Sequence, residues 1–254
     1  MSNCDIFYRR MMRVKKMIWM KHMISGARLF ACLVIIITNY SLLITNSASA
    51  QTRQQWRDSV EVLNRELRQH PDDVHLRLLK AEANVNLEEW DYALAEYGRI
   101  LRADERNLAA LFFRAYVHEK QRHYAEAKAD YDAFLAIEPL HFEARLGLAH
   151  VLQKMGKKKE VVDELNHIVQ MFPDSSDAYA ARAAFETEQQ QYEVAVYDWG
   201  EAARLRPDNV DYTISKVDGL LRLSRKREAR EALDDLVSKG TPRGVLKEWY
   251  DRTK

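Results

Sequence analysis

Apolar and small residues follow a helical pattern in this chain, and the pattern repeats at a fixed longer interval. Within residues 108–141, one set recurs at steps of three and four and therefore lies on one face of a helix: Tyr124, Ala127, Tyr131 and Leu135. The preceding stretch, 111–120, reads as another helix. The pattern predicts two helices joined by a short turn.

Turn signals mark the longer interval, since they stand 34 residues apart: Pro71, Glu105, Pro139, Pro173, Pro207 and Thr241. Proline lacks an amide hydrogen and clashes with the preceding helical turn, so it ends one pair of helices and starts the next. Small and bulky residues keep the same period: Ala81, Ala115, Ala149 and Ala183; Ala93, Ala127, Val161, Ala195 and Ala229; Leu63, Tyr97, Tyr131, Leu165, Trp199 and Leu233. Small residues let paired helices approach, and bulky ones fill the space between pairs.

A period of 34 with this small–small–bulky–Pro order resembles the tetratricopeptide repeat. The resemblance covers about residues 54–243, in five units: 74–107, 108–141, 142–175, 176–209 and 210–243. It implies an all-α fold, a right-handed superhelical solenoid of antiparallel helix pairs with about five units plus capping helices. Glu105 and Val217 depart from the family pattern, and its Trp-x-x-Leu-Gly signature is poorly kept. Each unit leaves an apolar face that only a neighbouring unit can bury.

Both ends of the array are predicted to be capped. Residues 52–69 continue the period backwards as a half unit, with an apolar stripe of Trp56, Val60, Leu63 and Leu67. At the other end a short helix opened by Pro242 carries a second stripe: Val245, Leu246, Trp249 and Tyr250. Proline suits a first helical position. Terminal units with a polar outer side are what solenoids require.

Residues 1–50 differ from the rest of the chain. A basic region from Arg9 to Arg28 precedes the apolar run 29–37, and small residues end the segment at Ala50. This order predicts a secretory signal peptide cleaved after Ala50, with 51–254 as the solenoid domain. The alternative is an uncleaved membrane anchor, although Thr38–Ser41 interrupts the apolar run and a span needs about 20 mainly apolar residues. We expect a periplasmic or secreted protein, and a membrane-anchored one only without cleavage.

Charge and cysteine content narrow the classes of function. The chain carries a net charge of +1, to which residues 1–50 contribute +6, so residues 51–254 carry −5. This mildly acidic balance argues against a nucleic-acid partner, which would favour a basic stripe. Both cysteines, Cys4 and Cys32, lie in the N-terminal segment. The remainder would therefore have no disulfide, thiol nucleophile or thiolate metal ligand.

The sequence predicts no catalytic residue, no metal site and no cofactor. His118 and His123 stand five residues apart, whereas the histidines of a zinc-protease helix must stand four apart to share a face. The basic run 157–159 reads as a solvated loop. The basic cluster 222–230 has acidic neighbours with which it can pair, and reads as a charged helix face.

Family resemblance instead implies a binding wall, because the first helices of such arrays line a concave groove for extended or helical peptides. We predict a partner-binding set on this wall: Leu78, Glu82, Phe112, Tyr116, Glu119, Leu146, His150 and Gln153. Phe112, Tyr116 and Leu146 would be apolar anchors, and the wall beyond them would be acidic. The alternative is that packing between units buries Phe112 and Tyr116. Leucine and phenylalanine stand where one subfamily carries carboxylate-clamping Lys and Asn, so that function is not supported.

The predicted function is an exported, non-enzymatic bacterial scaffold that binds a protein or peptide partner in the cell envelope. One alternative is a membrane-tethered structural component of an envelope assembly or secretion complex. Another is a glycan-uptake helper. The latter needs exposed aromatic platforms, whereas we expect Trp90 and Trp199 in the core.

Overall fold

The computed structural model describes residues 45–254, and side chains from Thr52 onward. Every regular element in this part is a helix: α2 (Thr45–Gln69), α3 (Val74–Asn86), α4 (Trp90–Ala103), α5 (Leu108–Lys120), α6 (Tyr124–Ile137), α7 (Phe142–Lys154), α8 (Lys158–Met171), α9 (Ser176–Glu188), α10 (Tyr192–Leu205), α11 (Val210–Arg222), α12 (Lys226–Ser238) and α13 (Lys247–Arg252). The basic region and apolar run of the predicted signal peptide lie outside the described residues. The predicted cleavage position, after Ala50, falls within α2.

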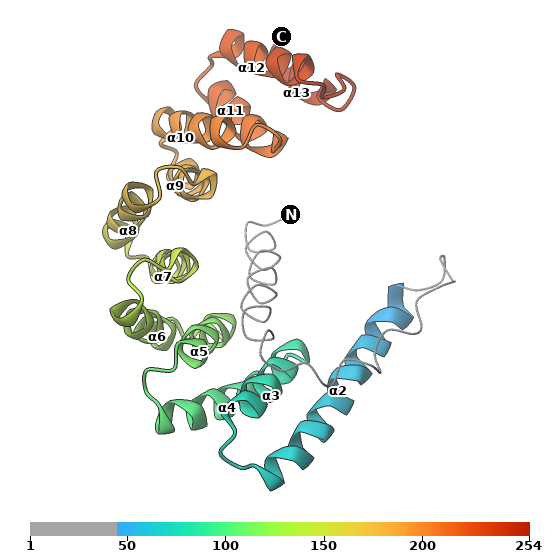
Figure 1. Cartoon of the computed structure of the whole chain (residues 1–254). Coiled ribbons are helices and arrows are strands. Elements are labelled where there is room, and N and C mark those ends of the chain that lie inside the picture. Colours follow the sequence, from blue (N-terminus) through green and yellow to red (C-terminus); the bar gives the residue numbers. More distant parts are fainter. Residues whose placement is uncertain (1–44) are drawn as a thin grey trace.

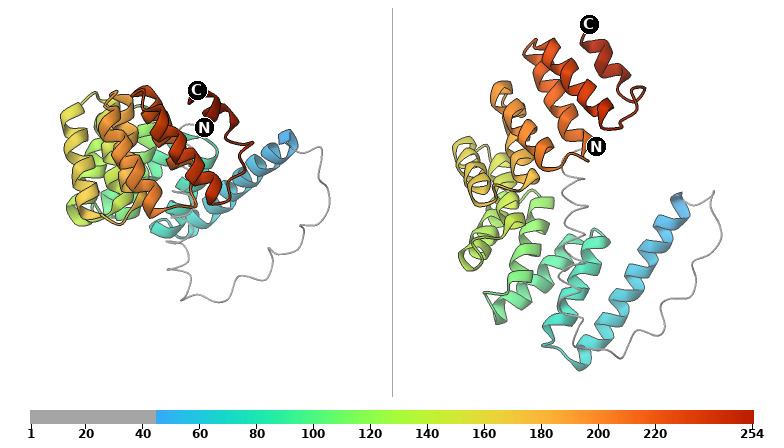
Figure 2. Two further views of the ribbon diagram at one scale, coloured as in Figure 1. Left: turned by 90° about the horizontal axis from the view of Figure 1, so that it is seen from above. Right: turned by 45° about the horizontal axis from the view of Figure 1, so that its top comes forward.

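Five helix pairs form the array, and each helix packs against the next along the chain. We number the pairs as units: α3/α4, α5/α6, α7/α8, α9/α10 and α11/α12. Figure 1 shows an open arc with α5, α7 and α9 on its inner side and α6 and α8 on its outer side. The further views in Figure 2 show the same row of pairs, with α2 and α13 at opposite ends. The predicted all-α superhelical solenoid of helix pairs is confirmed.

Each first helix begins with a capping side chain. Asp73 Oδ1 accepts a hydrogen bond of 3.0 Å from the amide of Leu76, which satisfies one of the free donors at the start of α3. Equivalent caps open the other four first helices: Asn107, His141, Ser175 and Asn209. The residues that precede the second helices make no side-chain cap. The turn residues thus mark where each unit starts.

The turn inside each unit passes through the left-handed region of backbone conformation. Its residues stand one period apart and have φ between 60° and 72°: Glu88, Arg122, Gly156, Gln190 and Ser224. Only one of the five is glycine, the residue that adopts this conformation without steric cost. The backbone geometry of the turn is therefore kept even where the sequence does not favour it.

The interior follows the predicted small and bulky series. Ala81, Ala115, Ala149 and Ala183 are buried where paired helices cross, as are the bulky residues from Tyr97 to Leu233. At Gly147 a Cβ atom would lie 2.5 Å from Cζ of Tyr131, so only glycine lets the Tyr131 ring lie against α7. Trp199 is also buried and Trp90 is partly buried, as expected.

Buried side chains form three clusters rather than one. The largest extends from Ala81 on α3 to Phe185 on α9. A small one joins α9 and α10 through Ala183, Ala195 and Trp199. The third holds α11, α12 and α13 together and includes Val196 of α10. The interior is thus divided near the fourth unit.

The two ends close the array in different ways. On α2 the predicted stripe is partly buried against the first unit, and Arg53 Nη2 donates to the carbonyl of Leu87. The C-terminal helix was expected to open at Pro242, but that was wrong, because residues 243–246 form turns and α13 begins at Lys247. Leu246 and Tyr250 are buried all the same. Within residues 45–254, no helix has the length and apolar character to cross a membrane.

Candidate partner-binding site

The predicted binding residues lie on three neighbouring first helices. Leu78 and Glu82 are on α3, and their counterparts one period later, Phe112 and Tyr116, are on α5. The remaining residues are Glu119 on α5 and Leu146, His150 and Gln153 on α7. Because α3 contacts α5 and α5 contacts α7, the fold brings the predicted set onto one side of the array.

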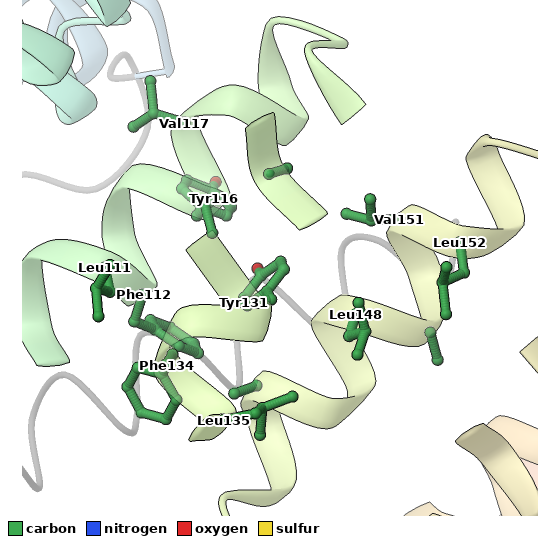
Figure 3. Close-up of a cluster of buried hydrophobic side chains, with 14 of the residues drawn as sticks. Leu111, Phe112, Tyr116, Val117, Tyr131, Phe134, Leu135, Leu148, Val151 and Leu152 are labelled. Carbon is green, nitrogen blue, oxygen red and sulfur yellow. The ribbon is translucent and has the colours of Figure 1, made fainter. Parts of the chain in front are cut away.

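Phe112 and Tyr116 are core residues, which corrects the expectation that they form an exposed apolar strip. Phe112 is 6 % exposed and Tyr116 is 3 % exposed. The Phe112 ring centroid lies 5.7 Å from those of Phe134 on α6 and His141 in the following turn, and 6.0 Å from that of Tyr131. Figure 3 shows Phe112 beside Phe134, with Tyr131 close by. The second helix and the following turn cover the residue, so the alternative of burial by packing is the one observed.

Partly exposed residues remain from the predicted set. Leu78 and Leu146 pack against the core with part of their surface open. Glu82, His150 and Gln153 are also partly buried. Partner binding by these five residues stays a prediction. Leu78 and Leu146 are the two apolar residues among them.

Glu119 is the most strongly perturbed acid on this wall. Burial raises its pKa to about 7, against a smaller lowering by the charges of Lys120 and Lys154. Its Oε2 has no hydrogen-bond partner among the described residues. A buried carboxylate without partners favours its neutral form. The Glu119 side chain is therefore divided between its charged and neutral forms near neutral pH.

His150 on α7 shifts in the other direction. Burial lowers its pKa to about 4, and the nearby charges of Lys154 and Lys120 lower it further. The imidazole is consequently neutral at physiological pH. Gln153 lies one turn further on α7, and its side-chain amide donates to Glu188 of α9. We call the connected residues on α5, α7 and α9 the inner polar strip: Glu119, Lys120, His150, Gln153, Lys154 and Glu188.

The acidic end predicted for the wall is neutralised by neighbouring side chains. Asp177 accepts hydrogen bonds from Tyr212 Oη at 2.6 Å and from Arg206 Nη2 at 3.1 Å. Asp218 pairs with Arg222 at 2.7 Å and with Arg252 at 2.8 Å. The predicted acids are present at these two positions, where Asp177 links α9 to α11 and Asp218 links α11 to α13.

A ladder of ion pairs was missed at the sequence level. Glu96, Asp130 and Asp198 are buried on second helices, and each pairs with a base on the first helix of its own unit. The partners are Lys80 at 2.9 Å, Arg114 at 2.6 Å and Arg182 at 2.6 Å respectively. In the third unit Leu148 stands in place of the base, and Glu164 accepts from Arg145 instead. Acids at 96, 130, 164 and 198 keep the 34-residue period, so the signal was present in the sequence.

Comparison with known proteins agrees with this architecture. Two family models described as tetratricopeptide repeat match residues 48–107 and 119–185. The chain belongs to the tetratricopeptide repeat family. Proteins of this family are in general non-catalytic interaction scaffolds. The repeats seen in the structure extend beyond the matched residues, to the fifth unit.

Two rice proteins (Oryza sativa subsp. japonica) are similar to this tetratricopeptide repeat protein along much of its length. The DnaJ protein P58IPK homologs A and B are each 26 % identical in an alignment of 234 residues, and the match covers 72 % of this chain and 49 % of the relative. The chain therefore spans about half the length of the curated relatives it matches.

Solved structures of other tetratricopeptide repeat proteins share the fold. One from Parabacteroides merdae ATCC 43184 is 21 % identical with a TM-score of 0.56, covering 82 % of both chains. MamA from Desulfovibrio magneticus RS-1 is 19 % identical with a TM-score of 0.56, over 66 % of this chain and 94 % of that one. YrrB, described as having an unusual peptide-binding site, is 18 % identical with a TM-score of 0.53, over 70 % and 92 %. At these identities the likeness concerns the fold alone.

Proposed function

We propose that this tetratricopeptide repeat protein is a non-enzymatic scaffold that binds an extended segment of a partner protein along α3, α5 and α7. The observation that carries the proposal is that partly exposed side chains lie on α3 and on α7, with the partly exposed Lys120 on α5 between them. Leu78 and Leu146 offer apolar contacts one helix on either side of the buried Phe112. His150 and Gln153 offer polar contacts beside Leu146. A site of this kind combines apolar anchoring with a few polar groups that set orientation.

Charge on the inner polar strip favours a particular kind of segment. At neutral pH burial keeps His150 neutral and leaves Glu119 partly neutral. The other ionisable residues of the strip are two lysines, Lys120 and Lys154, and one acid, Glu188. The strip thus has a positive bias on a chain whose residues 51–254 are acidic. A segment that pairs apolar side chains with carboxylate or carbonyl oxygens complements it. The peptide-binding site named for YrrB is consistent with this use of the fold.

Site-directed photocrosslinking tests this proposal in living cells. A benzophenone amino acid would replace Leu146 on the inner side, and in a matched control would replace Val162, which is 43 % exposed on the outer helix α8. We expect a discrete crosslinked partner from position 146 that is absent from position 162. Exchange of Lys154 for Glu should weaken that crosslink. Equal crosslinking from both positions would contradict binding on the inner side.

We also propose that the protein acts outside the cytoplasm of a bacterium, after removal of residues 1–50. The basis is the order of basic, apolar and small residues that ends at Ala50. Intact-mass measurement of the native protein should find Gln51 at the N-terminus, free or as pyroglutamate. A membrane-embedded species that keeps residues 29–44 would instead support a tethered component of an envelope complex.

A further inference from the structure

Two surface grooves occupy equivalent places in the array. The first, of about 580 Å³, lies between α4 and the second unit, where it is lined by Gly98, Leu101, Arg102, Arg114, Asp130 and Ala133, among others. The second, of about 710 Å³, lies between α10 and the fifth unit. Residues three repeat periods later line it: Gly200, Ala203, Arg204, Lys216, Ala232 and Asp235. The lining residues of the two grooves can therefore be compared position by position.

The two grooves differ in where their acids lie: Ala232 stands at the position of Asp130, and Asp235 stands at the position of Ala133. In the first, Arg114 donates two hydrogen bonds to Asp130, from Nε at 2.8 Å and from Nη2 at 2.6 Å. In the second, Lys216 replaces the arginine, and Ala232 replaces the aspartate. Lys216 makes no hydrogen bond or ion pair within residues 52–254. The second groove thus keeps the base of the ladder and lacks the acid.

Space for a missing acid is available beside the Lys216 ammonium. Ala232 ends at Cβ and lines the same open groove as Lys216. The Lys216 side chain itself lies against α10, since a Cβ atom added to Gly200 would be in ordinary contact with Lys216 Nζ at 3.6 Å. The pair in the first unit indicates what would fit, because Lys80 occupies the position of Lys216 and reaches Glu96 at 2.9 Å. A lysine at this position can therefore bind a glutamate-sized carboxylate.

We propose that the second groove binds a segment of a partner protein that places an aspartate or glutamate side chain on Lys216. The incoming carboxylate takes the place that Asp130 and Asp198 hold in their own units. A partly buried ammonium is stabilised by a counter-ion, which supplies the driving force for this contact. This groove is lined mainly by α10, α11 and α12, whereas the inner polar strip lies on α5, α7 and α9.

Most charges on the rim are paired on their own helices. Lys216 acts on one of them, Glu228, through its charge but forms no hydrogen bond or ion pair with it. Glu201 pairs with Arg204 at 2.8 Å, Glu228 with Arg225 at 2.5 Å and Asp235 with Lys239 at 2.7 Å. Glu231 lies 3.5 Å from Arg227. Glu193 lies in the first turn of α10, where the helix N-terminus stabilises an acid. Among the described residues that line the groove, Lys216 is the one base without an ion pair.

Apolar surface beside Lys216 argues for a protein segment as the source of the carboxylate. Tyr197 lines the groove and is 65 % exposed, and Val196, Leu220 and Leu236 contribute to the same wall. Tyrosine is one of the residue types enriched among those that carry the binding energy of protein interfaces. The expected segment therefore carries apolar residues next to its acid.

A random peptide library displayed on phage tests the proposal against the full chain. Selected peptides would be synthesised, and their affinity would be measured by fluorescence anisotropy for the wild type, Lys216→Met and Ala232→Glu. We expect peptides with an Asp or Glu among apolar residues, and an affinity loss of about tenfold or more in both variants. Exchange of the peptide acid for its amide should cause the same loss, whereas Lys226→Met on the exposed side of α12 should change little.

The glutamate variant gives a second readout that does not depend on the peptide. Ala232→Glu restores the ion pair of the first unit, so it should keep the helix content and raise the melting temperature while it blocks binding. The proposal is overturned if no selected peptide loses affinity in Lys216→Met, or if Ala232→Glu binds such peptides as the wild type does. Neither result would affect the crosslinking from position 146.

Discussion

Arg182 on α9 donates two hydrogen bonds to Asp198 on α10, from Nε at 2.6 Å and from Nη2 at 2.9 Å. Its third nitrogen, Nη1, donates to Asn166 on α8 of the preceding unit at 2.9 Å. One guanidinium therefore joins the two helices of its own unit and fixes that unit to its neighbour. The aspartate is fully buried, so the carboxylate depends on these bonds for its solvation.

We predict that Asp198→Ala lowers the free energy of unfolding by about 3 kcal/mol, because the partly buried Arg182 loses its two hydrogen bonds to a carboxylate and keeps only Glu186, at 3.9 Å, as a counter-ion. Chemical denaturation of the two proteins measures the difference. The control is Asp132→Ala, which removes an exposed pair with Lys128 and should cost about 0.5 kcal/mol or less. Similar losses in both variants would show that burial of the pair is not what matters.

Phe112→Ala should destabilise the whole array, since the ring is packed against Phe134, Tyr131 and His141. We expect a loss of about 3 kcal/mol or more, the usual cost of removing a buried aromatic ring. Circular dichroism during thermal unfolding would detect it. Leu146→Ala is the comparison, with a smaller loss because Leu146 is partly exposed. If Phe112→Ala melted as the wild type does, the residue would be a surface anchor after all.

Glycine at the strained turns should stabilise the protein. Arg122 has φ of 62°, a conformation that costs a residue with a side chain roughly 1 kcal/mol and glycine nothing. Arg122→Gly is therefore expected to raise the melting temperature, and Gly156→Ala at the equivalent turn to lower it. Ala125→Gly is a control within the exposed face of α6, where glycine should destabilise by up to about 1 kcal/mol.

Glu119 should make stability depend on pH in a defined direction. Its pKa rises from 4.5 to about 7 on folding, so the folded chain binds an extra proton between these values. The proton on Glu119 stabilises the folded chain at low pH and is lost as the pH rises through about 7. Its loss lowers the free energy of unfolding by on the order of 2 kcal/mol. Glutamine cannot ionise, so Glu119→Gln avoids this loss. The stability of the variant relative to the wild type should therefore be greater at pH 8 than at pH 5.

His150 opposes this trend and must be separated from it. Its pKa falls from 6.5 to about 4 on folding, so its contribution is present at high pH and is lost as the pH falls through this range. Denaturation of the wild type, Glu119→Gln and His150→Gln across pH 4 to 8 distinguishes the two. A pH profile unchanged by Glu119→Gln would contradict the raised pKa.

The sequence was sufficient to predict the repeat architecture, but it was insufficient to predict which site residues are exposed. Helix pairs and crossing alanines follow from residue type and spacing alone. Burial of Phe112 does not, since it depends on how Phe134 and His141 close over it from a second helix and a turn. The absence of the ladder acid beside Lys216 could be recognised only from the sequence and the structure together. The acid series could be read from the sequence, but only the structure shows that its positions line a groove.

Division of the interior into three clusters has a consequence for how the chain comes apart. A solenoid is held by contacts between neighbours, so it can separate where those contacts are fewest. Units one to three share a continuous interior, whereas α11 to α13 form their own. Among the junctions between adjacent units, contacts are fewest between α8 and α9. Amide exchange should therefore be slow from α3 to α8 and faster in a block from α9 onward, as if two proteins of different stability had been joined. A partner bound beside Lys216 would slow exchange in that second block alone, which makes the weaker end of the array the part that reports on binding.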